Sequence, residues 1–196
     1  MSAEPLSRRE KNRLNMRGRI KKAATLLFVD QSIEATSVTE IANAADIAEK
    51  TFYNHYPTKR DLLSDMSDEM IRLCNRLVED AANNASDFDT AVNRAYQNLA
   101  DEMTAYPALA KGLVNFVMSQ STHDQLPAET MTFMPVLEVG RKHQSLSDQF
   151  DIAFLDRMLT GTHYNVTLHW TNNPNDNLQQ QMEHAAAFLL QSAKKR

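Results

Sequence analysis

A short polar stretch of this 196-residue chain carries side chains suited to hydrogen bonding with a nucleic acid. Lys50 supplies a long donor for guanine edges, and Thr51 supplies a methyl group for thymine or a hydroxyl for a phosphate. Tyr53 and His55 could contact a phosphate or a base. Lys59 stands where a new helix would begin, and the free backbone N–H groups of such a helix end already favour an anion. The spacing of these residues predicts one face that fits the groove of a DNA duplex.

Two short helices joined by a turn are expected to hold this face. Ser37 and Glu40 form a capping box, in which each residue satisfies a backbone donor of the other. Apolar residues then recur at helical spacing, at Val38, Ile41, Ala42 and Ala45. Asp46 tolerates the left-handed conformation of a tight turn, and Pro57 ends the second helix. Residues 37–63 are therefore predicted to form a helix-turn-helix.

The side chains of the second helix divide between inside and outside. We expect Ile47 and Phe52 to face the core. The residues expected to face outward are Glu49, Lys50, Thr51, Tyr53 and His55. A simpler alternative is an amphipathic helix pair whose polar face is only solvated. The ordered succession of capping box, turn, aromatic-polar helix and Pro-Thr-Lys cap favours DNA binding.

Residues 19–63 resemble the DNA-binding domain of the TetR (tetracycline-repressor-like) family of bacterial transcriptional regulators. Residues 20–28 are similar to its first helix, residues 36–42 to the start of its second, and residues 51–63 to its recognition helix and the cap that follows. The resemblance implies that seven positions contact DNA, namely Ser37, Thr39, Lys50, Thr51, Tyr53, His55 and Lys59.

Three positions depart from the family pattern. Family members usually carry glycine near residues 32–33 and again where Asp46 stands, and often a serine cap where Ala48 stands. Without a side-chain cap at Ala48, the recognition helix is expected to fray more when it is free.

The composition predicts an all-α protein. The chain has four Gly and six Pro and shows no strand-like alternation of polar and apolar residues. We expect a basic, flexible N-terminal arm at residues 1–18 and a three-helix DNA-binding domain at residues 19–58. Residues 59–196 are expected to form a helical domain for effector binding and dimerisation.

The charge is distributed unevenly along the chain. Residues 1–60 carry eleven Lys and Arg against seven Asp and Glu, whereas residues 61–196 have a balance of −8. Eight basic residues lie in one stretch whose only acid is Glu10, namely Arg8, Arg9, Lys11, Arg13, Arg17, Arg19, Lys21 and Lys22. This stretch is either a solvated tail or an arm that orders on DNA, and the asymmetry favours a nucleic-acid-binding head on an acidic body.

Apolar periodicity predicts six further helices, at residues 59–83, 88–105, 107–118, 128–143, 147–171 and 176–193. The fourth is expected to bend near Pro135. The last two resemble the family's C-terminal helix pair, which packs against its copy as a four-helix bundle. The residues expected at this interface are Phe154, Met158, Gly161, Leu168, Ala185, Phe188 and Leu189. The alternative is that both helices only complete the core of a monomer.

A homodimer of this kind would set two recognition helices about one DNA turn or a small multiple apart and would require a palindromic operator. The central helices would hold an apolar or amphipathic small-molecule effector, since ten methionines are available and flexible thioethers line adaptable pockets. The residues proposed for this pocket are Met66, Met70, Met103, Phe116, Met118, Met131 and Met134. Each of them could instead belong to an ordinary helical core.

Other classes of function find little support. The chain contains no nucleophile elbow, phosphate-binding glycine loop or HExxH motif, so no enzyme and no cofactor are expected. His123, His143 and His163 are scattered, which argues against a metal site, and a proton-transfer pair at His123 and Asp124 is expected to be only loop surface. Cys74 is expected to be a small buried group, as suits a reducing compartment.

The N-terminus has no signal peptide and no apolar run is long enough to span a bilayer, so a cytoplasmic, nucleoid-associated protein is expected. The sequence as a whole predicts a ligand-responsive repressor that binds DNA as a dimer. In this hypothesis the effector displaces the helix at residues 59–83, whose first turn carries Lys59. The alternative is a helical dimer that binds a small molecule or a protein and whose DNA head is vestigial.

Overall fold

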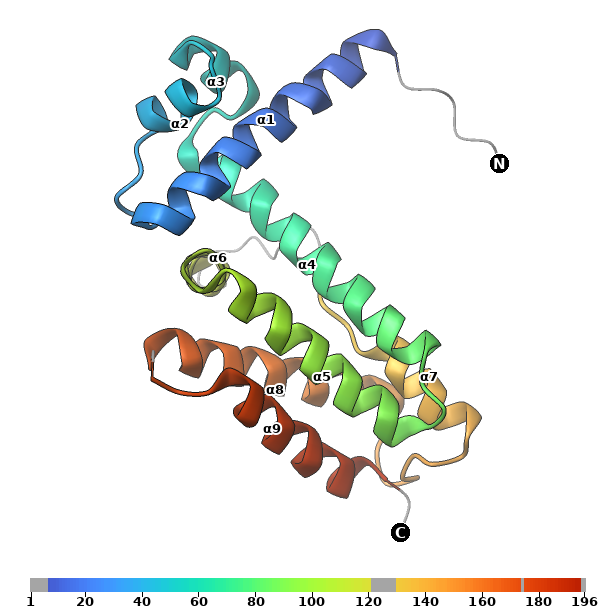
Figure 1. Ribbon diagram of the computed structural model, residues 1–196. Coiled ribbons are helices and arrows are strands. Elements are labelled where there is room, and N and C mark those ends of the chain that lie inside the picture. The colour runs from blue at the N-terminus through green and yellow to red at the C-terminus, as the bar shows by residue number, and fades with distance from the viewer. Residues whose placement is uncertain (1–6, 121–129, 174, 195–196) are drawn as a thin grey trace. The chain divides into compact units, whose positions relative to one another are not determined.

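The computed structural model describes residues 7–120, 130–173 and 175–194, and every regular element within them is a helix apart from an isolated bridge between Leu146 and Lys194 (Figure 1). The nine helices of these residues are α1 (Arg8–Gln31), α2 (Val38–Ala44), α3 (Glu49–His55), α4 (Lys59–Asn83), α5 (Phe88–Ala105), α6 (Pro107–Gln120), α7 (Met134–Lys142), α8 (Ile152–Asn172) and α9 (Leu178–Ala193). The predicted all-α fold is confirmed. The chain divides into two compact units, Met1–Met66 and Ser67–Arg196.

The first unit packs α1 against α2 and α3 around a small apolar core. Its fully buried side chains are Ile20, Ala24, Phe28, Ile41, Ala42, Phe52, Tyr56 and Leu62. Ile20 and Phe28 lie on one face of α1, because residues about two turns apart on a helix point the same way. α2 and α3 are each only seven residues long, so they depend on this core for their stability.

The first helix begins earlier than the resemblance indicated. Ser7 caps α1 with a capping box, in which its Oγ accepts from the Glu10 N–H at 3.2 Å and its own N–H donates to Glu10 Oε2 at 3.0 Å. These hydrogen bonds lower the pKa of Glu10. Residues 8–18, which were expected to form a flexible arm, are therefore helical, because the capping box satisfies donors that a helix start otherwise leaves unpaired.

The end of α1 is strained at Ser32. This residue has φ 79° and ψ 162°, a region that is essentially restricted to glycine. Its carbonyl oxygen accepts a hydrogen bond from Thr36 Oγ1 at 2.7 Å, which holds the loop in this conformation. The resemblance to the family indicated a glycine near this place, and the serine that stands here adopts a conformation that suits glycine.

Ser32→Gly is expected to stabilise the first unit by about 1 kcal/mol, because relief of roughly 1–3 kcal/mol of backbone strain exceeds the greater chain entropy of glycine. The free energy of unfolding would be measured in urea from the amide NMR signals of α1 and α2. Ser32→Ala is the matched control, since it removes the same hydroxyl but keeps the Cβ. Equal effects of the two substitutions would contradict the assignment of strain.

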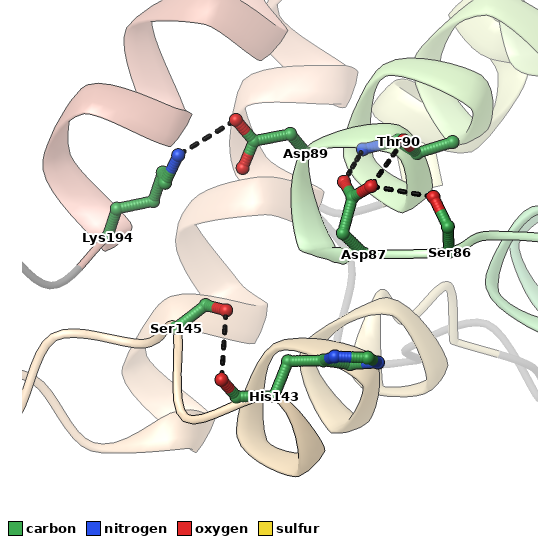
Figure 2. Close-up of polar contacts among 7 residues, drawn as sticks. All are labelled: Ser86, Asp87, Asp89, Thr90, His143, Ser145 and Lys194. Carbon is green, nitrogen blue, oxygen red and sulfur yellow. Dashed lines mark hydrogen bonds and ion pairs between the residues drawn. The ribbon is translucent and has the colours of Figure 1, made fainter.

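The second unit is built mainly on the packing of α5 against α9, with α8 beside them (Figure 1). Its largest fully buried side chains include Tyr96, Phe88, Phe133 and Leu99. Asp87 caps α5 by accepting from the Thr90 N–H at 2.8 Å, and hydrogen bonds from Ser86 and Thr90 lower the pKa of Asp87 to about 2 (Figure 2).

The two ends of this helical pair are also linked. An ion pair of 2.8 Å between Lys194 Nζ and Asp89 Oδ2 joins the end of α9 to the first turn of α5, as Figure 2 shows. Cys74 is buried in the same core, and burial raises the pKa of its thiol to about 12. This agrees with the predicted role of Cys74 as a small packing group.

Three helices of this unit start later than predicted. α7 begins at Met134, so residues 130–133 are not helical, while residues 128–129 lie outside the described residues. The expected bend at Pro135 is wrong, because this proline lies in the first turn, where no backbone donor is needed. α8 begins at Ile152 behind an Asp151 cap and α9 at Leu178 behind an Asn177 cap, so side-chain caps rather than apolar periodicity set these starts.

Helices α4 and α5 have the predicted bounds, and α6 continues two residues beyond its predicted end. His123 and Asp124 lie outside the described residues. None of the described helices combines the length and the apolar character that a membrane span requires. Within the same residues, no group of three His, Cys, Asp or Glu side chains could hold a metal ion.

Candidate nucleic-acid interface

The turn between α2 and α3 is closed by two backbone hydrogen bonds. The N–H of Ile47 donates to the Ala42 carbonyl at 3.0 Å, and the N–H of Asp46 donates to the Asn43 carbonyl at 3.0 Å. This is a Schellman motif, in which the first of the two donor residues along the chain adopts the left-handed conformation. Asp46 supplies it with φ 52°. The predicted helix-turn-helix is confirmed, and the position where the family usually has glycine keeps the glycine-like conformation.

The start of α2 is held by the predicted capping box. Ser37 Oγ accepts from the Glu40 N–H at 3.2 Å, and the Ser37 N–H donates to Glu40 Oε2 at 2.7 Å. Gln31 Nε2 adds a hydrogen bond to Glu40 at 3.2 Å. Hydrogen bonds from Ser37 and Gln31 lower the pKa of Glu40. Ser37 thus has its backbone fixed by this box, while its side chain stays on the exposed surface.

The start of α3 has no such cap. Ala48 precedes the helix with no side-chain hydrogen bond to its free donors, as expected from the sequence. A different contact holds α3 against α2, since Thr39 Oγ1 donates to Glu49 Oε1 at 2.6 Å. Sequence reasoning placed Glu49 on the outer face but gave it no role. Its role in the structure is to fix the hydroxyl of Thr39, one of the seven expected DNA contacts.

The two faces of α3 differ as predicted. Phe52 is 0% exposed, and its ring meets the ring of Tyr53 edge-on at 5.5 Å. Tyr53 is 47% exposed and Lys50 is exposed, whereas Thr51 and His55 are half-buried. The long and aromatic side chains of α3 therefore project from a rigid base, which is what a recognition helix needs.

The end of α3 lies close to cationic side chains of α1. Burial lowers the pKa of His55, and the positive charges of Arg17 and Arg13 lower it further. His55 is therefore neutral at neutral pH, and it lies among positive charges. The positive charge of Arg13 and Arg17 near the end of α3 favours an approaching phosphate backbone.

Lys59 is already engaged within the first unit. Its ammonium donates to the carbonyl of Ile33 and to that of Thr36, the latter at 2.5 Å, and its half-buried position lowers its pKa. An ammonium has three N–H donors, so two carbonyls leave one for a phosphate. Lys59 thereby joins the start of α4 to the loop before α2.

Two arginines that were counted only as part of the basic stretch have defined structural roles. Arg19 Nη2 donates to the Ala45 carbonyl at 2.7 Å and to the Asp46 carbonyl at 3.3 Å, which satisfies oxygens at the end of α2. Arg17 Nε donates to the Tyr56 hydroxyl at 3.1 Å, and this hydroxyl donates to Asp65 Oδ2 at 2.6 Å. These partners are 26 and 39 residues apart, so no local signal in the sequence indicates them.

The methionines proposed for an effector pocket are distributed over several helices. Met66 is buried at the end of the first unit, Met103 and Met131 belong to the core of the second unit, and Met70 packs against that core. The half-buried members of the set on α6 and α7 are Phe116, Met118 and Met134.

The residues proposed for dimerisation differ in exposure. Phe188 is 66% exposed, Met158 is 42% exposed and Gly161 is also exposed. The half-buried members are Phe154 and Leu168, and those buried in the core of the same chain are Ala185 and Leu189. α8 and α9 thus keep exposed apolar side chains although both contribute to the core.

Comparison with known proteins decides the family of the first unit. Residues 20–66 match the family model of the bacterial regulatory proteins, tetR family. The N-terminal domain is a TetR-family domain. The match begins within α1 and continues through α2, α3 and the turn between them to the first residues of α4. TetR-family regulators are DNA-binding proteins and not enzymes, so the resemblance drawn from the sequence is confirmed.

Three further comparisons extend over most of the chain. The HTH-type transcriptional repressor KstR2 of Rhodococcus jostii is 23% identical over 155 residues, which is 75% of each chain. The TetR-family repressor FadR of Thermus thermophilus, solved with lauroyl-CoA, superposes with a TM-score of 0.69 at 23% identity and covers 92% of this chain and 96% of FadR. RolR, solved with resorcinol, gives a TM-score of 0.68 at 15% identity over 94% and 90% of the two chains. These structures show that the second unit also has the fold of such regulators.

Proposed function

We propose that this TetR-family transcriptional regulator is a repressor that binds a palindromic operator as a homodimer and is released by a small apolar or amphipathic effector. The observation that carries the proposal is the two-sided recognition helix. Its inner side is anchored by the fully buried Phe52, its outer side presents Lys50 and Tyr53, and His55 at its end is near Arg13 and Arg17 of α1. The repressor relative supports repression as the sign of regulation.

The exposed apolar side chains of α8 and α9 support a homodimer. Phe188 and Met158 are large and exposed, and a Cβ added at Gly161 would meet no atom within 4 Å. Large exposed apolar side chains on adjacent helices favour a protein contact, and a small residue allows close approach of a second helix. A twofold pair would present two recognition helices to two half-sites, which is why we propose a palindrome.

Ligands of similar folds support the class of effector. FadR was solved with lauroyl-CoA and RolR with resorcinol, and both ligands join an apolar part to polar groups. The flexible thioethers of Met103 and Met131 in the core of the second unit suit such an apolar part. α4 would couple the two functions, because it begins at Lys59 in the first unit and continues to Asn83 in the second. The coupling requires only about 1–3 kcal/mol of ligand preference for the arrangement that does not bind DNA.

Two lysine substitutions test the DNA interface. Lys50→Ala is expected to relax base preference at one operator position, with a loss of about 1–3 kcal/mol of discrimination, because a base-edge donor is removed. Lys59→Ala is expected to weaken binding to all sequences alike and to reduce the slope of log affinity against log salt by about 1. The measurements are selection of bound fragments from random DNA and mobility shifts at several salt concentrations.

Lys142→Ala provides the control, since it removes an exposed lysine of α7 outside the first unit. If both test variants keep full affinity for the operator, the DNA contacts assigned to Lys50 and Lys59 are wrong. A wild-type protein that bound no duplex at low salt would instead favour the alternative of a ligand-binding or protein-binding helical dimer with a vestigial head.

A further inference from the structure

A histidine in the core of the second unit has a ring nitrogen without a hydrogen-bond partner. His163, in α8, is 3% exposed, and its Nδ1 is buried with no partner among the described residues. Thr160, three residues earlier and therefore on the same face of α8, also has a buried hydroxyl oxygen without a partner. Two buried polar atoms on one face of α8 are thus unpaired, although buried polar groups are normally paired.

The other polar groups nearby do have partners. The Tyr96 hydroxyl donates to the Leu159 carbonyl at 2.7 Å, and Thr167 Oγ1 donates to the His163 carbonyl at 2.8 Å. A hydroxyl on a helix can turn toward a carbonyl of the preceding turn, so Thr160 has an internal alternative. An imidazole nitrogen has no such local partner in a helix whose backbone groups are already used. His163 is therefore the group whose burial needs an explanation.

The surroundings of His163 are aromatic and apolar. The ring of Phe133 lies 6.4 Å from the imidazole and the ring of Tyr164 lies 5.8 Å from it, measured between centroids. Phe133 stacks on Tyr96 at 5.1 Å, and burial raises the pKa of the Tyr164 hydroxyl. A single polar nitrogen set among aromatic walls is typical of the way in which small-molecule sites orient an apolar ligand.

The charge state of the imidazole restricts the ligand. Burial lowers the pKa of His163 to about 4, so the ring is neutral at physiological pH. A neutral imidazole offers one N–H donor and one acceptor nitrogen and no charge for a carboxylate. An uncharged hydroxyl or carbonyl group is the complementary partner.

We propose that His163, with Thr160 beside it, anchors the effector through an uncharged hydroxyl or carbonyl group, and that the rest of the effector is apolar. The inference rests on the proposed function, since it names the chemistry by which the second unit binds its ligand. Leaving this nitrogen unpaired lowers the stability of the unliganded protein, and the ligand would supply the missing hydrogen bond.

The unliganded protein provides the first test. His163→Leu is expected to raise the midpoint of thermal unfolding by about 2–6 °C, because an apolar side chain of similar size replaces an unpaired polar one. A histidine that serves only packing would give a lower midpoint on the same substitution, and that result would overturn the proposal. Trp170 fluorescence is a suitable signal, since this residue belongs to the core of the same unit and is the only tryptophan.

Ligand binding provides the second test, with probes matched in chain length. The probes are 1-decanol, methyl decanoate and decanoate, with resorcinol as an aromatic diol. At least one uncharged probe is expected to bind the wild-type protein, to bind His163→Leu at least tenfold more weakly, and to shift the ¹⁵N resonance of His163 Nδ1. Ser67→Ala is the matched control, because it removes another buried unpaired hydroxyl from the second unit and should change the affinity less than twofold. Decanoate binding alone, no binding by any uncharged probe, or equal affinity in His163→Leu would overturn the proposal.

The same variants separate this inference from the proposed function. A probe that releases the wild-type protein and His163→Leu from DNA at the same concentration would support the proposed repressor function. It would contradict the role of His163 in binding the effector. If the wild-type protein binds no operator but the probes still bind it more tightly than they bind His163→Leu, the role of His163 is supported. The proposed repressor function is then wrong.

Discussion

Phe52→Ala is expected to unfold the first unit and to abolish operator binding. Phe52 is 0% exposed and its ring lies 5.9 Å from that of Tyr56, so truncation leaves a cavity at the centre of a small core. Removal of a buried phenylalanine costs about 3–5 kcal/mol, which is a large part of the roughly 5–15 kcal/mol that stabilises a domain. The measurement is urea unfolding followed by the amide NMR signals of α1, α2 and α3.

Tyr53→Ala is the matched control, because Tyr53 is the next residue of the same helix and points outward. This substitution is expected to change the free energy of unfolding by less than about 1 kcal/mol and yet to weaken operator binding. Trp170 fluorescence reports the second unit in both variants and should keep its unfolding midpoint. Equal loss of stability in the two variants would mean that the inner and outer faces of α3 are wrongly assigned.

Local signals explain why much of the first unit could be predicted. The effects of the Ser37–Glu40 capping box and of the turn residue Asp46 extend over only a few residues. They can therefore be predicted from the types of neighbouring residues in the sequence. The division of α3 into inner and outer faces follows from helical spacing around Phe52. The bounds of α4 and α5 were also predicted, because both helices carry a long apolar stripe.

Long-range contacts explain what could not be predicted. Arg17 and Arg19 belong to a basic stretch, and basic stretches are usually solvated. Only the folded chain brings Arg19 to the carbonyls at the end of α2 and Arg17 to Tyr56. His163 was weighed only as a metal ligand in the sequence, because burial inside a helical core leaves no mark on spacing that distinguishes it from a surface histidine.

Asp65→Ala is expected to destabilise the first unit by about 2 kcal/mol, the range found for hydrogen bonds to charged groups. The carboxylate accepts from the Tyr56 hydroxyl at 2.6 Å and lies 3.4 Å from both Arg17 Nη2 and Lys21 Nζ. Its loss would leave a buried hydroxyl without its acceptor and two cations without their counter-charge. Glu79→Ala, which removes an exposed acid from the same helix, is the control and should cost less than about 0.5 kcal/mol.

The pH dependence of this difference tests the electrostatic cause. Burial would raise the pKa of Asp65, but the hydrogen bond from Tyr56 and the charges of Lys21 and Arg17 outweigh it and hold the pKa below its ordinary value. A carboxyl whose pKa is lower in the folded than in the unfolded state stabilises the fold above its unfolded pKa of about 3.9 and loses this contribution as the pH falls through the folded value. The difference in unfolding free energy between wild type and Asp65→Ala should therefore be constant from neutral pH down to about pH 5 and shrink below about pH 4. A difference that stays the same at pH 3, measured from the α1 and α3 amide signals in urea, would mean that Asp65 stabilises the unit by packing and not by its charge.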